Sequence, residues 1–118
     1  MANRENKVKD AAFGLAVRSV KLAQYLQKEH QEFVLSKQVL RSGTSVGANI
    51  EEALAGQSRN DFIAKMAIAS KEARETLYWI RLLKETGYLE SKAAESIRRD
   101  GEEVVRLLTA IVKSSQEK

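Results

Sequence analysis

The sequence has 118 residues, of which 43% are hydrophobic and 31% charged, a composition typical of one folded domain rather than of a disordered chain. It contains no proline and no cysteine, which excludes disulfides, thiolate metal sites and cysteine nucleophiles and leaves long helices without a forced break. Charges interrupt every apolar run and the N-terminus does not resemble a signal peptide, so we expect a cytoplasmic protein without a membrane span. The net charge of +4 permits a nucleic-acid partner without requiring one.

The first predicted helix runs from about Arg4 to Gln27. Apolar or small residues recur in it at alternating steps of four and three, which indicates a helix with one buried stripe. The stripe consists of Val8, Ala12, Leu15, Ser19, Leu22 and Leu26. A polar run then ends the helix and places His30, the only histidine, in a loop. Ser36 is the predicted N-cap of the second helix.

The second and third helices show the same spacing. The stripe of the second helix consists of Val39, Gly43, Val46, Ile50 and Ala53, and Gly56 follows as its predicted C-terminal cap. Ser58 and Asp61 form a start resembling a capping box for the third helix. Its stripe consists of Phe62, Met66, Ala69, Ala73, Thr76, Ile80 and Leu83. We expect this helix to end at Gly87.

The fourth helix starts near Ser91 and has the most regular pattern. Its stripe consists of Ala94, Ile97, Gly101, Val104, Leu108 and Ile111. Four helices of similar length with short polar connections predict an all-α fold, an antiparallel up-down-up-down four-helix bundle. With no repeat and no low-complexity tract, residues 1–118 form a single predicted domain.

Three small residues in the second helix, Gly43, Gly47 and Ala48, need an explanation because a helical glycine costs about 1 kcal/mol relative to alanine. A phosphate-binding loop is one interpretation, but no strand precedes these glycines and no Gly-Lys-Ser/Thr ending follows them. We therefore predict that the three residues allow another helix to approach closely.

The sequence offers no catalytic or metal centre. A carboxylate-bridged metal site in a bundle needs Glu-x-x-His pairs on two helices, and His30 is alone. Four glutamates on the second and third helices could face one another: Glu51, Glu52, Glu72 and Glu75. Without histidines, such carboxylates more often pair with arginines, here Arg41 or Arg81, or stay in water. We predict no cofactor, no metal, no small-molecule substrate and no enzymatic activity.

Two helices carry apolar residues outside their buried stripes. These are Phe13, Val17 and Val20 on the first helix and Ile68, Trp79 and Leu82 on the third. A small bundle covers one stripe per helix, so the extra residues predict contacts between subunits of a homo-oligomer. In the alternative interpretation they lie half-buried at the edges of a broad core.

Two further stripes combine cations with a tyrosine at spacings of three, four and three. One consists of Arg18, Lys21, Tyr25 and Lys28, the other of Lys71, Arg74, Tyr78 and Arg81. Such a helix side suits a phosphate backbone, with the tyrosine stacked on a base. The alternative is that both stripes are ordinary solvated surfaces.

One long segment resembles a known family. The run is LRSGTSVGANIEEALAGQSRNDFIAKMAIASKEARETLYWIRLLKETGYL, residues 40–89. It is similar to bacterial four-helix-bundle proteins first noticed in intervening sequences of 23S ribosomal RNA genes, which are sometimes labelled ribosomal proteins. These proteins in turn resemble the accessory protein of diversity-generating retroelements.

This resemblance implies a four-helix subunit of a homopentameric ring without established enzymatic activity. It also implies RNA or DNA binding through a basic surface, for which the stripe with Arg74 and Arg81 is the candidate. The sequence therefore predicts a non-enzymatic, self-associating bundle that binds nucleic acid weakly. A structural or protein-binding adaptor oligomer without a nucleic-acid role is the alternative.

Overall fold

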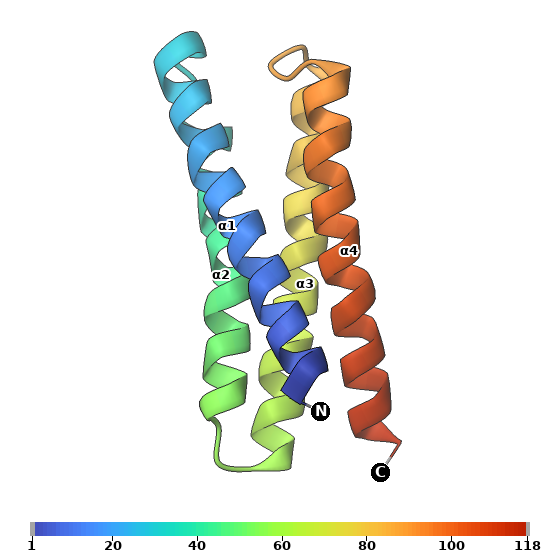
Figure 1. Cartoon of the computed structure of the whole chain (residues 1–118). Helices are drawn as coiled ribbons and strands as arrows, with labels where there is room; N and C mark the ends of the chain where they lie inside the picture. The colour runs from blue at the N-terminus through green and yellow to red at the C-terminus, as the bar shows by residue number, and fades with distance from the viewer. Residues whose placement is uncertain (1, 118) are drawn as a thin grey trace.

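The computed structural model describes residues 2–117 and contains four helices there: α1 (Ala2–His30), α2 (Leu35–Ala55), α3 (Arg59–Glu85) and α4 (Ser91–Gln116). They form a rod of 47 × 21 × 19 Å. The α1–α2 and α3–α4 connections lie at one end, and the α2–α3 connection lies at the other (Figure 1). Each helix packs on the next one along the chain, and α4 also contacts α1. The predicted antiparallel four-helix bundle is confirmed.

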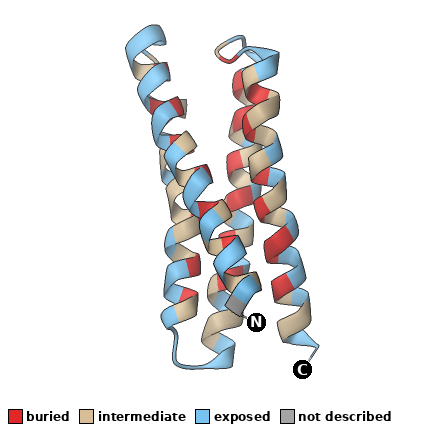
Figure 2. Cartoon of the chain, viewed as in Figure 1, coloured by how far each residue is buried: buried red, intermediate tan, exposed pale blue. Residues whose placement is uncertain are grey.

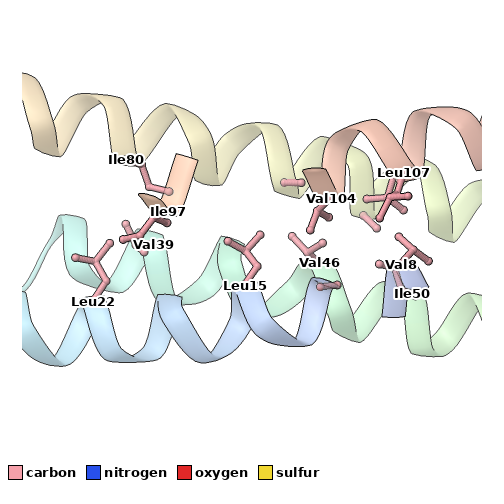
Figure 3. Packing of buried hydrophobic residues seen from close by; sticks show 14 of the residues in the cluster. Val8, Leu15, Leu22, Val39, Val46, Ile50, Ile80, Ile97, Val104 and Leu107 are labelled. Atoms are coloured by element: carbon pink, nitrogen blue, oxygen red, sulfur yellow. The ribbon is translucent and has the colours of Figure 1, made fainter. Parts of the chain in front are cut away.

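The four predicted stripes form the core. All their members are buried except Phe62, which is half-buried. Buried positions recur along the helices (Figure 2), and labelled side chains such as Leu15, Val46 and Val104 meet between them (Figure 3). The largest fully buried side chains are Leu15, Leu26, Ile50, Met66, Leu83 and Leu108. Because each such side chain contributes roughly 1.5–3 kcal/mol when removed from water, the stripes account for the assembly of the bundle.

Four buried hydroxyl groups, those of Ser19, Ser36, Ser42 and Thr76, interrupt this apolar core. Thr76 Oγ1 lies 2.9 Å from Ser42 Oγ and donates a hydrogen bond to it, which joins α3 to α2. Ser19 Oγ donates to the carbonyl oxygen of Leu15 at 2.8 Å. Within residues 2–117, every buried side-chain nitrogen or oxygen has such a partner, so these groups avoid the cost of burying an unsatisfied polar atom.

Close contact between α1 and α2 depends on one glycine. A Cβ atom at Gly43 would lie 1.9 Å from Ser19 Oγ and 2.4 Å from Ser19 Cβ, so no larger residue fits without movement of α1. At Gly47 the three atoms nearest to the added Cβ all belong to Ala12, at an ordinary 3.8 Å. Ala48 is exposed. The close approach thus involves the two glycines, above all Gly43, and Ala48 does not line it.

The start of α2 differs from the prediction. Helix α1 continues to His30, and α2 begins at Leu35, so Ser36 lies inside the helix and is buried. Its predicted N-cap role is wrong. The carboxylate of Glu32 instead accepts hydrogen bonds from the backbone N–H groups of Leu35 at 2.9 Å and Ser36 at 2.8 Å. A side chain before the helix therefore satisfies its first free donors.

The remaining helix ends follow the sequence closely. Ser58 is the N-cap of α3, and its hydroxyl accepts the N–H of Asp61 at 3.0 Å. After α3, Gly87 adopts a positive φ of 86°, and the N–H of Tyr88 reaches back to the carbonyl of Leu83 at 3.0 Å. The positive φ and this hydrogen bond are typical of a helix that ends at a glycine. The chain then reverses toward α4.

Replacing Glu32 by glutamine should destabilise the protein at neutral pH by about 1 kcal/mol, the usual effect of losing a cap. Burial raises the pKa of Glu32, but the hydrogen bonds from the backbone of Leu35, Ser36 and Val34 outweigh burial and lower it overall. A lowered pKa stabilises the fold above the unfolded-state value of about 4.3, and this contribution is lost as pH falls through the folded-state pKa.

Urea unfolding at pH 7 and at successively lower pH tests this expectation. The difference between wild type and Glu32→Gln should shrink as the medium becomes acidic. Glu29→Gln, a matched change at an exposed position of α1, should have little effect at any pH. Equal stability of the Glu32 variant and wild type at pH 7 would contradict the capping role.

Candidate nucleic-acid interface

The predicted cationic stripe on α1 faces α4, and its first member is already paired. The guanidinium of Arg18 lies 2.8 Å from Asp100 Oδ2 and donates to Ser96 Oγ at 3.0 Å. Both partners belong to α4. Arg18 therefore links α1 to α4, where the two helices contact each other, and its charge is compensated within the bundle.

Arg18, Lys21 and Tyr25 border a groove of about 460 Å³ between α1 and the start of α4, and Lys28 does not line it. Leu22, Leu89 and Ile97 are among the residues that line it. Tyr25 is also part of the wall and contacts His30, whose ring packs edge-on against those of Tyr25 and Tyr88 at 5.3 and 5.4 Å. The last residue of α1 is thus fixed in an aromatic cluster, although the sequence placed His30 in a loop.

The predicted stripe on α3 is much less engaged. Lys71, Arg74, Tyr78 and Arg81 are all exposed. In the described part of the chain, Lys71 and Arg81 make no ion pair or side-chain hydrogen bond, and Arg74 makes only a 3.4 Å contact with Thr109 Oγ1. Tyr78 is 51% exposed. The structure therefore separates two stripes that the sequence presents as equivalent.

The α3 stripe borders a second groove, of about 480 Å³, between α3 and the first half of α4. Three stripe members, Arg74, Tyr78 and Arg81, are in its wall, together with Lys84. Sequence reasoning missed Lys84, although it follows Arg81 by three residues and so continues the same side of the helix. The opposite wall comes from α4.

That opposite wall contains two carboxylates held by one arginine. Arg98 donates to Glu95 through Nε at 3.0 Å and also pairs with Glu102 through Nη1 at 2.5 Å. The hydrogen bond from Arg98 lowers the pKa of Glu95 below its ordinary value, so that carboxyl is ionised and compensated at neutral pH. Sequence reasoning also missed Arg98. Its two partners lie three residues before it and four residues after it, and this spacing of opposite charges is common on the surface of any helix.

The predicted apolar interface residues lie on the other side of the bundle. At 100° per residue, Phe13 and Val20 point away from Arg18 and therefore away from α4. They are 67% and 37% exposed, and Val17 between them is similarly accessible. On α3, Ile68 is exposed, whereas Trp79 and Leu82 are half-buried. The edge-of-core interpretation thus describes Trp79 and Leu82 but not Phe13.

Contacts of α2 show that the apolar residues of α3 border α2. Arg41 of α2 pairs with Glu72 at 3.1 Å and also with Glu75. Trp79 donates from Nε1 to the same Glu75 carboxylate at 3.1 Å, which places the indole beside α2. No Cα atom of α1 lies within 8 Å of a Cα atom of α3 in the described residues. Their apolar residues therefore flank α2, and the two cationic stripes flank α4.

Two classes of site are not found among residues 2–117. No cluster of three or more histidine, aspartate and glutamate side chains there could hold a metal ion. In the same residues, no helix has the length and apolar character needed to cross a membrane. The groove between α3 and α4, with Arg74, Arg81, Lys84 and Arg98 in its wall, is therefore the candidate functional surface.

Comparison with protein families decides the identity of this bundle. The profile of the 23S rRNA-intervening sequence proteins matches residues 4–110, which is nearly the whole chain. The chain belongs to this family. The resemblance seen in residues 40–89 is thereby confirmed and extended to both sides.

A solved relative of this 23S rRNA-intervening sequence protein has the same fold. It is a protein of unknown function from the S23 ribosomal protein family of Bacteroides thetaiotaomicron, 53% identical, with a TM-score of 0.92 over 93% of this chain and 98% of that chain. Among curated proteins, none matches this chain. The expected likeness to the retroelement accessory protein remains a prediction.

Proposed function

We propose that this 23S rRNA-intervening sequence protein is a non-enzymatic, self-associating bundle of the cytoplasm that binds nucleic acid through the α3 side of the groove between α3 and α4. The proposal rests on one observation: in the described residues, Lys71 and Arg81 make no ion pair, and Arg74 makes only a 3.4 Å contact with Thr109. Unpaired cations at helical spacing are available to phosphates without breaking any contact of the fold.

The contrast with the α2 side of the bundle supports this choice of surface. There Arg41 is held by Glu72 and Glu75, and Lys65 lies 2.9 Å from Glu52. A cation paired in this way must break its contact with the carboxylate before it can bind a phosphate. On α1, Arg18 is compensated by Asp100. In the described residues, the two stripes thus differ in one cation: Arg18 of α1 is ion-paired, whereas Arg74 of α3 has only its contact with Thr109. A polyanion on the α3 stripe would therefore break no ion pair.

The test is the salt dependence of binding to a fluorescently labelled RNA oligonucleotide. Replacement of Lys71, Arg74 and Arg81 by glutamine should weaken binding at low salt and reduce the slope of log affinity against log salt by about 2 to 3, roughly one per lost phosphate contact. Fluorescence anisotropy between 50 and 300 mM salt measures both quantities.

A matched triple variant separates site from net charge. Lys7, Lys9 and Lys37 lie on α1 and α2, outside both stripes, and their replacement by glutamine removes the same charge elsewhere, so the slope should stay close to that of wild type. Equal losses in the two triple variants would contradict the assignment to α3. If wild type binds no RNA or DNA even at low salt, the adaptor without a nucleic-acid role is the better description.

A further inference from the structure

One aromatic side chain stands between the free cations of α3. Tyr78 follows Arg74 by four residues and precedes Arg81 by three, so all three lie on one side of the helix. All three are in the wall of the groove between α3 and α4. Seven residues of helix separate the two guanidinium-bearing positions by about 10 Å along the axis. A cation therefore lies roughly one helical turn to either side of the tyrosine.

The ring of Tyr78 is half exposed and is not stacked face to face on another aromatic ring in the described residues. It is 51% exposed, and its ring is inclined by 69° to that of the neighbouring Trp79, with ring centroids 5.2 Å apart. Such a T-shaped contact supports the orientation of the ring without a parallel stack. Tyr78 thus offers a platform on which a flat ligand could stack.

The wall of the groove contains more cations than carboxylates. On its α4 side, Arg98 binds both Glu95 and Glu102, which leaves one net negative charge there. On its α3 side, Arg74, Arg81 and Lys84 outnumber Glu85. The positive charge of the groove therefore lies on the α3 side.

We propose that the groove between α3 and α4 takes a single-stranded segment of nucleic acid, with one unpaired base stacked on Tyr78 and the flanking phosphates held by Arg74 and Arg81. This inference rests on the proposed function and adds the form of nucleic acid to it. Bases in a duplex are stacked on each other, and unstacking one costs a few kcal/mol. The phosphates of a duplex could therefore bind Arg74 and Arg81, but none of its bases would stack on Tyr78.

Anisotropy titrations with a labelled 12-nucleotide strand, and with the same strand annealed to its complement, test the inference. The single strand should bind at least about tenfold more tightly than the duplex at moderate salt. Tyr78→Ala should weaken single-strand binding by about tenfold, within the range known for base–aromatic stacking, and should not change the salt slope because tyrosine carries no charge. Tyr78→Phe should retain binding.

Two further variants make the result specific. Arg81→Gln should lower the salt slope by about one, which a stacking residue does not do. Tyr25→Ala, a comparably exposed tyrosine in the other stripe, should bind like wild type. If duplex binds as tightly as single strand and Tyr78→Ala has no effect, the single-strand inference fails while the proposed function stands. If neither form binds, both fail.

Discussion

Replacing Gly43 by alanine should lower the free energy of unfolding by about 2 kcal/mol, although alanine is the better helix former. The new Cβ would lie 1.9 Å from Ser19 Oγ, and Ser19 is 1% exposed and anchored to the carbonyl of Leu15. Because this clash is severe, we expect a cost of about 3 kcal/mol, at the upper end of the range for overpacking a core. The gain of about 1 kcal/mol in helix propensity reduces the net loss to about 2 kcal/mol.

Chemical denaturation of the variant and of two controls measures this effect. Gly14→Ala makes the same substitution in α1 where an added Cβ meets nothing within 4 Å, so it should stabilise the protein by up to about 1 kcal/mol. Adding Ser19→Gly to Gly43→Ala removes the clashing side chain and should recover part of the loss. A Gly43→Ala protein as stable as wild type would show that the two helices can move apart freely.

Replacing Phe13 by glutamate should dissociate the proposed oligomer while leaving the subunit folded. Phe13 is 67% exposed in the single chain, so a charge at this position costs the isolated bundle little. Buried against another subunit, the same carboxylate would lose its water and replace an aromatic anchor, which should weaken association by about a thousandfold or more. Light scattering coupled to size exclusion reports the change in mass.

Variants at other exposed positions define the interface more closely. Gln57→Glu adds the same charge in the loop before α3 and should keep the wild-type mass. Ile68→Glu tests whether the apolar surface of α3 also takes part, and it disturbs the fold less than a change at the half-buried Trp79. A wild-type protein of monomeric mass would refute self-association, and a Phe13→Glu protein of unchanged mass would exclude this part of α1 from the contact.

Much of the fold could be predicted because its determinants are local in sequence. A residue such as Leu108 is buried because it continues the spacing of three and four that places apolar side chains on one side of a helix. Gly87 ends α3 because glycine adopts a positive φ without strain. The start of α2 was mispredicted because serine is an intrinsically good cap, and only the path of the chain decides that Glu32 reaches the free N–H groups first.

The candidate site could be predicted only in part. Spacing placed Arg74, Tyr78 and Arg81 on one side of a helix, and it did the same for the stripe of α1. Whether a cation is available depends on what faces it from another helix, and Asp100 lies 82 residues from Arg18. No periodicity within a single helix contains that information.

The sequence by itself determined four helices, the side of each that enters the core, and the family. These features depend on the period of 3.6 residues and on a pattern continuous along the chain. Only the tertiary structure decided that Arg18 of α1 is ion-paired with α4, that Lys71 and Arg81 of α3 have no ion pair in the described residues, and that the exposed apolar residues flank α2. Ion pairing and exposure are properties of neighbours in space, and packing brings together side chains that are far apart in the sequence.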